Sequence, residues 1–236
     1  MDKFLLPSKI RYEEIDKNKA NLIVEPLYFG YGTTIGNMLR RVLLSSLPGA
    51  AVTAVKINGV AQEFSAIPNI KEDVLEICLN LKGLRLKVFS DEPIKLTLKA
   101  KGEKKVTAKD IEKNSSVEIA NPDLHIATIS DKAGVLEMEI TVEKGRGYWP
   151  TEERKKQDLE IGTIMIDALF TPVVNVGYQV ENTRVGDITN YDKLTMNIET
   201  DKTITPKEAI EQAVKILEDH LVLLKGEEAV EKKDSE

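Results

Sequence analysis

Two amphipathic segments, one near each end of the chain, carry its clearest hydrophobic pattern. In the first, within residues 30–49, apolar residues recur at the i, i+3, i+4, i+7 and i+8 spacing of one helical face. The stripe consists of Ile35, Met38, Leu39, Val42 and Leu43. Thr33 or Thr34 can cap the start of this helix, and Pro48-Gly49 ends it. Gly36 lies beside the stripe, where its missing side chain lets another backbone approach closely.

The second amphipathic segment begins at Thr205-Pro206-Lys207-Glu208, which combines a capping box with proline at the first helical position. Its apolar residues then recur at spacings of four and three, as Ile210, Val214, Leu217, Leu221 and Leu224. This heptad seam spans about two repeats, too few for a free-standing coiled coil, so it must pack on another surface. We predict that it packs on the stripe of the first helix, which brings the two ends of the chain together.

Runs that alternate between apolar and polar residues, or that are rich in β-branched residues, predict strands between these helices. The expected strands are residues 10–15, 21–27, 51–57, 60–64, 84–88, 94–98, 117–119, 124–129, 135–142, 161–168, 174–180 and 194–198. Asn58-Gly59 is a hairpin signal, so the strands on either side of it should pair. A third helix is expected at residues 72–81, and its inward residues are Val74, Leu75, Ile77, Cys78 and Leu81. The highly charged residues 151–160 predict an exposed loop.

This order of elements predicts an α+β fold in two parts. Residues 1–49 and 172–226 should form a discontinuous α/β subdomain, because strands from both ends of the chain accompany the two packed helices. Residues 50–171 should form an inserted β-rich subdomain. Residues 227–236 are mostly polar and charged, which is typical of the beginning of a flexible linker.

Composition and charge narrow the class of function. The net charge of -6 argues against a protein whose main task is to hold a phosphate backbone. Cys78 is the only cysteine, so a disulfide framework or a cysteine-rich zinc site is excluded. No apolar run approaches the length of a membrane span, and the start lacks a signal-peptide pattern. We expect a soluble, intracellular protein.

The sequence carries no pattern typical of an active site. A polymerase centre needs clustered carboxylates for two magnesium ions, whereas Glu72-Asp73 and Glu152-Glu153 are pairs expected on solvent faces. Gly30-Tyr31-Gly32 and Gly145-Arg146-Gly147-Tyr148 lack the Lys-Ser or Lys-Thr of a phosphate-binding loop, so they predict turns. The two histidines are about a hundred residues apart, with no nucleophile motif nearby. We expect no catalytic residue, metal or cofactor in this chain.

The outward face of the first helix has an unusual mixture of side chains. Asn37, Arg40, Arg41 and Leu44 place a leucine beside two guanidinium groups. Arginine with apolar anchors is enriched at the centres of protein interfaces, so this face suits a protein partner. A solvated helix face explains the same residues about equally well, since exposed arginines and single exposed leucines are common.

The segment Thr34-Ile35-Gly36-Asn37-Met38-Leu39-Arg40-Arg41 resembles the signature helix of the alpha subunit of bacterial DNA-directed RNA polymerase, in its N-terminal assembly domain. Further segments match that family in order and approximate spacing: residues 58–60, 72–77, 79–83, 145–148 and 178–181. The resemblance runs from about Phe4 to about Leu224. It implies the same two-part fold, with residues 1–49 and 172–226 as a dimerisation subdomain.

The resemblance also implies a function. The family member dimerises, and the dimer then receives the β subunit on one copy and the β′ subunit on the other. It is a non-catalytic subunit of a cytoplasmic, nucleoid-associated nucleotidyltransferase complex, and it needs no cofactor of its own. DNA is reached only indirectly, through the holoenzyme or a C-terminal domain that would follow the linker.

The resemblance assigns three sets of contact residues. Arg41 matches the family's signature arginine for binding the β subunit. The implied β contacts are Gly36, Asn37, Arg40, Arg41, Leu44, Ser45, Glu72 and Asp73. The expected dimer contacts are Phe29, Ile35, Met38, Leu39, Val42, Ile210, Val214, Leu217 and Leu221, although each could fill the core of its own subdomain instead. The implied β′ contacts are Lys82, Val173, Asn175 and Gly177.

Two other classes of function stay open beside this one. A free-standing nucleic-acid-binding regulator would use the basic runs at residues 99–105 and 154–156. Both runs are interrupted or flanked by glutamate and lack interleaved aromatic residues for base stacking, which argues against direct DNA binding. A small-molecule enzyme would use the β-rich middle of the chain.

Overall fold

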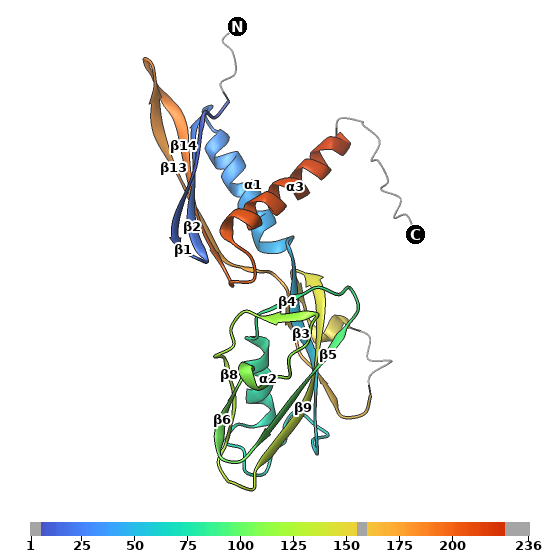
Figure 1. Ribbon diagram of the computed structural model, residues 1–236. Helices are drawn as coiled ribbons and strands as arrows, with labels where there is room; N and C mark the ends of the chain where they lie inside the picture. The colour runs from blue at the N-terminus through green and yellow to red at the C-terminus, as the bar shows by residue number, and fades with distance from the viewer. Residues whose placement is uncertain (1–5, 155–159, 225–236) are drawn as a thin grey trace. The chain divides into compact units, whose positions relative to one another are not determined.

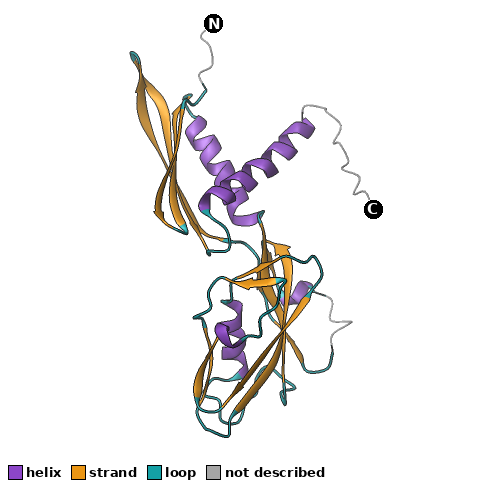
Figure 2. Cartoon of the chain, in the orientation of Figure 1, coloured by secondary structure: helices purple, strands orange, loops and turns teal. Residues whose placement is uncertain are grey.

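The computed structural model describes residues 6–154 and 160–224 and shows an α+β fold (Figure 1). The chain divides into two compact units. The first comprises the described residues within Met1–Leu47, Val173–Thr200 and Ile204–Glu236, and the second comprises those within Pro48–Pro172 and Asp201–Thr203. Figure 2 shows that strands dominate both units and that the longer helices belong to the first. The α+β class predicted from the sequence is therefore confirmed.

A four-stranded antiparallel sheet forms the base of the first unit. Its strands follow the order β1 (Lys9–Asp16), β2 (Lys19–Leu27), β14 (Ile188–Thr200) and β13 (Val173–Val185). The sheet therefore joins one hairpin from the start of the chain to a second hairpin from near its end. Both hairpins contain strands that the alternating pattern predicted, although β13 and β14 are longer than expected.

Helices α1 (Tyr31–Ser45) and α3 (Pro206–Leu224) pack on this sheet (Figure 1). Leu39 and Leu43 of α1 share one core cluster with Ile210 and Ala213 of α3 and with alternate residues of β14. Leu194, Met196 and Ile198 of β14 are completely buried. The prediction that the two ends of the chain meet through their helices is confirmed, because α1 and α3 contact each other within this cluster.

The beginnings of the two helices differ in how they are capped. The predicted capping box of α3 is confirmed: Glu208 N donates to Thr205 Oγ1 at 3.2 Å, and Thr205 N donates to Glu208 Oε2 at 2.8 Å. The predicted cap of α1 is wrong. The helix begins at Tyr31, before Thr33, and its cap position is Gly30, which has a φ of 82° and no side chain to accept a hydrogen bond.

Gly36 of α1 lies against side chains of the sheet rather than against another backbone. A Cβ atom at this position would lie 2.8 Å from Cδ2 of Tyr178 and 3.0 Å from Cδ1 of Leu194. These separations are shorter than van der Waals contact, so only glycine lets α1 approach the sheet this closely. The predicted close approach is correct, but its partner is different.

The second unit is built on a sheet with the order β11 (Thr163–Met165), β3 (Pro48–Ile57), β9 (Val135–Arg146) and β5 (Ile94–Lys101). Among its described residues, three two-stranded sheets accompany this one: β4 (Leu86–Val88) with β7 (Val117–Ile119), β6 (Lys104–Thr107) with β8 (His125–Ile129), and β10 (Tyr148–Trp149) with β12 (Ala168–Leu169). Two short 3-10 helices lie at Ala108–Asp110 and Thr151–Glu153.

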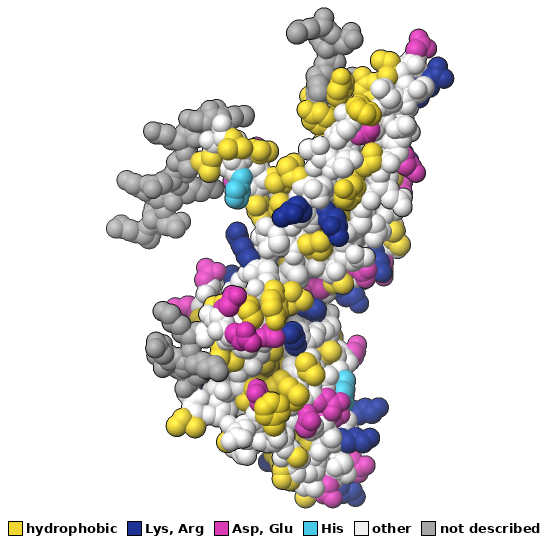
Figure 3. Space-filling model, turned by 180° about the vertical axis from the view of Figure 1, so that it is seen from behind, with side chains coloured by type: hydrophobic (Ala, Val, Ile, Leu, Met, Phe, Trp, Pro, Cys, Tyr) yellow, Lys and Arg dark blue, Asp and Glu magenta, His cyan; other side chains and the backbone are white. Residues whose placement is uncertain are grey.

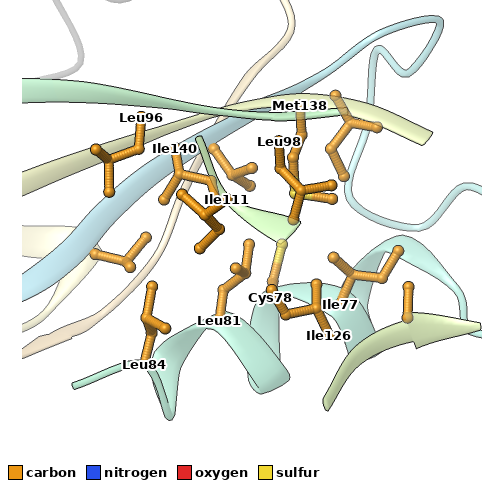
Figure 4. Packing of buried hydrophobic residues seen from close by; sticks show 14 of the residues in the cluster. Ile77, Cys78, Leu81, Leu84, Leu96, Leu98, Ile111, Ile126, Met138 and Ile140 are labelled. Atoms are coloured by element: carbon orange, nitrogen blue, oxygen red, sulfur yellow. The ribbon is translucent and has the colours of Figure 1, made fainter. Parts of the chain in front are cut away.

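Helix α2 (Val74–Lys82) closes the core of the second unit. Figure 4 shows Ile77, Cys78 and Leu81 pointing from α2 towards Leu98 and Ile140 of the sheet. Along β9, alternate residues from Leu136 to Val142 are buried, which confirms the predicted one-sided strand.

Several local predictions in this unit are wrong. Residues 60–64 form no strand, because β3 pairs with β9 and β11 instead of folding back on itself after Gly59. Helix α2 begins two residues later than predicted, and Leu75 is 41% exposed rather than inward. The predicted strand at 161–168 is divided into β11 and the start of β12. Parts of the predicted loop at 151–160 and all of the predicted linker at 227–236 lie outside the described residues.

Candidate protein-interaction surface

The outward ridge of α1 is formed by Asn37, Arg41 and Ser45, which are exposed. They are four residues apart, so they follow one another along the same helical face. Ser45 Oγ donates to the backbone oxygen of Arg41 at 2.8 Å. Within the described part of the chain, the guanidinium of Arg41 makes no hydrogen bond or ion pair. The ridge therefore presents a solvated arginine that can form bidentate bonds with a carboxylate.

Three other residues of the predicted β-subunit set contact their own unit, unlike the exposed ridge of α1. Arg40 is exposed, but its Nε donates to the backbone oxygen of Val176 in β13 at 3.1 Å, so it also holds α1 to the sheet. Leu44 is half-buried against the core cluster of its own unit, and the prediction that it is exposed is wrong. Gly36 is buried at the contact with Tyr178, so it faces inward rather than outward.

The heptad seam of α3 is only partly covered. Ile210 is buried and Leu217 is half-buried in the core cluster, whereas Val214 is 46% exposed and Leu221 is 49% exposed. Leu224 at the end of α3 and Phe29 just before α1 are exposed as well. Figure 3 shows hydrophobic side chains on the surface of this unit close to Lys and Arg side chains. The apolar seam therefore extends beyond the chain's own core.

The remaining predicted dimer residues lie on α1. Leu39 is buried in the core of its own unit, as Ile210 is, so the alternative of internal packing applies to these two. Ile35, Met38 and Val42 are half-buried, which leaves part of each side chain on the surface. The predicted dimer set thus divides into core residues and surface residues.

Glu72 is an internal residue of the second unit, and the prediction of a solvent face is wrong. Its Oε2 accepts from the backbone N–H of Thr128 at 2.6 Å, and its Oε1 accepts from Thr128 Oγ1 at 2.9 Å. His125 Nε2 lies 2.8 Å from Oε1. Burial raises the pKa of this carboxyl, but the hydrogen bonds from His125 and Thr128 outweigh it and hold the pKa below its ordinary value. Glu72 therefore ties the start of α2 to β8.

Asp73 is exposed and caps α2, because its carboxylate accepts from the backbone N–H of Glu76 at 2.7 Å. Lys82 lies at the end of the same helix. Its Nζ is 3.3 Å from Oδ2 of Asp167 and lies over the ring of Tyr148. The hydrogen bond from the Thr151 N–H, followed by those from Tyr148 and Lys82, lowers the pKa of Asp167 to about 2 despite its burial cost. Asp73 and Lys82 thus have structural partners of their own.

Of the other residues in the predicted β′ set, Val173 is 2% exposed and belongs to the core of the first unit. Its expected place on the surface is wrong. Asn175 and Gly177 are exposed on β13, and nothing lies within 4 Å of a Cβ placed on Gly177. Lys82 belongs to the second unit, whereas Val173, Asn175 and Gly177 belong to the first.

Asp192, a buried residue beneath α1, was not predicted from the sequence. It is 5% exposed, and its Oδ2 accepts from the backbone N–H of Gly32 in α1 at 2.9 Å. The signal was its position: Asp192 is in phase with Leu194, Met196 and Ile198 on the buried face of β14. A charged residue on a buried face needs a hydrogen-bonding partner, which is a reason to look for one.

Other chemical groups add little to the site. Residues 6–154 and 160–224 contain no group of three or more His, Cys, Asp or Glu side chains that could hold a metal ion. Burial, with a smaller effect of Glu63 and Asp73, raises the pKa of the Cys78 thiol to about 11. No helix in the described part of the chain is long and apolar enough to cross a membrane.

These features define an α+β protein with an exposed arginine ridge on α1 and a partly exposed apolar seam on α3. Residues 55–171 match the model of the RNA polymerase Rpb3/RpoA insert domain. The chain is 54% identical over 220 residues to the DNA-directed RNA polymerase subunit alpha of Oceanobacillus iheyensis, covering 92% of this chain and 70% of the relative. It is 56% identical over 208 residues to the subunit of the same name from Symbiobacterium thermophilum, covering 88% of this chain and 66% of the relative.

A third relative, from Moorella thermoacetica, has the same name and is 54% identical over 218 residues, covering 92% of this chain and 69% of the relative. The chain belongs to the family of DNA-directed RNA polymerase alpha subunits and spans about two thirds of the length of these relatives. The resemblance predicted from the sequence is therefore confirmed.

Proposed function

We propose that this chain is the assembly scaffold of an RNA polymerase. Two copies associate through α1 and α3, and the dimer then receives the β subunit on one copy and the β′ subunit on the other. The observation that carries the proposal is the match to alpha subunits over nine tenths of the chain. The exposed seam of α3 and the arginine ridge of α1 supply surfaces of the kind that such an assembly needs.

A second copy of the chain is the partner that fits the apolar seam. Val214 and Leu221 lie about two turns apart on α3, so their exposed surfaces belong to one face. Full burial of an aliphatic side chain contributes about 1.5–3 kcal/mol, and each half-exposed residue can still gain part of that. In a two-fold dimer every such residue is buried twice, once in each copy, which doubles the gain.

The ridge of Arg41, Asn37 and Ser45 is the surface proposed for the β subunit. Its exposed polar side chains offer hydrogen-bond donors, and the Arg41 guanidinium has no internal partner among the described residues. Asp73 is a further exposed candidate for β, and Lys82, Asn175 and Gly177 are exposed or half-exposed candidates for β′. Because Lys82 and Asp73 lie in the second unit, each unit would then contribute its own contacts.

Catalysis in this proposal belongs to the β and β′ subunits, and the chain itself holds no active site and no cofactor. DNA is contacted only through the assembled polymerase or through a C-terminal domain. The protein then works in the cytoplasm as part of the nucleoid-associated enzyme. The comparisons give no support to the alternative of a free-standing nucleic-acid-binding regulator.

The proposal is tested by co-expressing the chain with the β subunit and comparing Arg41→Ala with the unmodified protein. We expect the variant to keep a mass of twice 26.3 kDa in light scattering but to lose β on co-purification. Arg11→Ala, which changes an exposed arginine on β1 of the same unit, is the matched control. Normal capture of β by Arg41→Ala, or a one-copy mass for the unmodified chain, contradicts the proposal.

A further inference from the structure

We infer that Asp192 is the N-terminal cap of α1, supplied from strand β14, and that it fixes α1 in the position from which the Arg41 ridge faces outward. The second part of this inference rests on the proposed function, whereas the first does not. The residues that form the contact are 160 positions apart in the sequence.

The start of α1 lacks a local cap. The first N–H groups of a helix have no partner within the helix, and a side chain at the cap position normally accepts one of them. Gly30 occupies that position and cannot do so. Tyr31 N donates to Tyr28 O at 2.9 Å, and Thr34 N donates to Gly30 O at 3.3 Å. Gly32 N donates to Oδ2 of Asp192, so this carboxylate replaces the missing capping side chain.

Asp192 in turn depends on this helix end. Its side chain is buried in the row of β14 residues that face the core, and within the described residues it makes no ion pair. An uncompensated buried carboxylate is costly, so its hydrogen bond to Gly32 and the positive end of the helix dipole together stabilise the charge. The pairing of β14 with β2 shifts register between Asp192 and Leu194, which is a feature that re-aims side chains.

The space at this contact accepts only glycine on the helix. A Cβ atom on Gly32 would lie 2.7 Å from Cγ1 of Val180 and 3.0 Å from both Cβ and Oδ2 of Asp192. Any larger residue at position 32 would push α1 away from the sheet and break the hydrogen bond. Gly32 and Asp192 therefore act as one joint between α1 and its sheet.

The contact between Gly32 and Asp192 lies at the start of α1, before the proposed interface. Arg41 follows Gly32 by nine residues, or about two and a half turns, on the same continuous helix. A loosened first turn allows α1 to rotate or shift on the sheet, and the outward ridge moves with it. Asp192 is thus a positioning residue, which acts on a partner through α1 and not by touching it.

The test measures hydrogen exchange of individual amides in the purified chain. Asp192→Ala should speed exchange at Gly32 and Thr34 about tenfold, the order expected for the loss of a cap, while amides of the β2–β14 ladder stay protected. Asp192→Asn keeps an acceptor and should restore most of the protection. Gly32→Ala should loosen the same turn, and its effect should not add to that of Asp192→Ala, because both remove one contact. Asp187→Ala, which removes an exposed carboxylate from the turn between β13 and β14, is the matched control.

Unchanged exchange at Gly32 and Thr34 in Asp192→Ala overturns the inference, and so does equal loss of protection throughout β2 and β14. If Asp192→Ala does not fold, the other two variants decide. Asp192→Asn should keep most of the protection at this turn and Gly32→Ala should lose it, and the same exchange in both overturns the inference. Capture of the β subunit is then measured for each folded variant. Normal capture by Asp192→Ala overturns the link to the interface while Arg41→Ala still loses β, whereas capture by both variants overturns the proposed function itself.

Discussion

The carboxylate of Glu72 and the backbone N–H of Thr128 form a hydrogen bond of 2.6 Å that joins the start of α2 to β8. The Thr128 hydroxyl and the ring of His125 bond to the other oxygen of the same carboxylate. Three partners around one nearly buried group make this contact a structural tie in the second unit, and they give it a predictable dependence on pH.

Glu72→Gln should lower the free energy of unfolding at neutral pH by about 1–3 kcal/mol, because it removes charge-assisted bonds to a buried group. The folded-state pKa of Glu72 lies below its ordinary value of 4.5, so its contribution is complete above that value. It is lost as the pH falls through the folded-state pKa. Urea unfolding at pH 7 and at pH 3 should therefore show a smaller gap between the two proteins at the lower pH. Glu118→Gln, on an exposed position of β7, should show no such trend, and a gap that widens in acid contradicts the assignment.

Gly36→Ala should destabilise the first unit even though alanine favours helices. The gain in helix propensity is about 1 kcal/mol. The new Cβ would lie 2.8 Å from the ring of Tyr178, and overpacking of this kind costs about 1–3 kcal/mol. A thermal melt should show a lower midpoint than for the unmodified chain. Gly177→Ala meets no atoms and serves as the control, and a raised midpoint for Gly36→Ala would show that α1 does not lie this close to the sheet.

Leu221→Glu combined with Val214→Glu should convert the proposed dimer into single copies. Both residues are about half exposed in one chain, so the change should leave the fold intact while placing charges at an apolar interface. Analytical ultracentrifugation at several concentrations measures the outcome. Leu79→Glu changes a leucine of α2 that is 60% exposed and should leave the mass unchanged. A double variant that keeps the mass of the unmodified chain places the dimer contact elsewhere.

Local pattern was sufficient for the elements whose signal lies within a few residues. The capping box at Thr205 and the seam that begins at Ile210 specified α3, since both depend on hydrogen bonds and spacings inside one helix. The alternation along β9 specified which face is buried, because neighbouring side chains of a strand point to opposite sides. The outward position of Arg41 followed in the same way from the periodicity of α1.

The candidate site was predicted less completely, because burial on a helix or strand depends on what packs against it. Leu44 was expected outside and is half-buried, and Val173 was expected at a surface and is in a core. Glu72 resembled an ordinary surface charge because His125 and Thr128, which bind it, are more than fifty residues away. The hairpin signal at Asn58-Gly59 gave a turn but no second strand, since β9 and β11 occupy both edges of β3.

The sequence by itself determined the two amphipathic helices, the alternating strands and the family to which the chain belongs, because short-range periodicity and motif identity are written in consecutive residues. Only the tertiary structure decided how the helices are fixed and which charges are internal. The pair of Gly32 and Asp192 shows the reason: a hydrogen bond between residues 160 positions apart arises from the folding of β14 beside α1, and no local pattern encodes it.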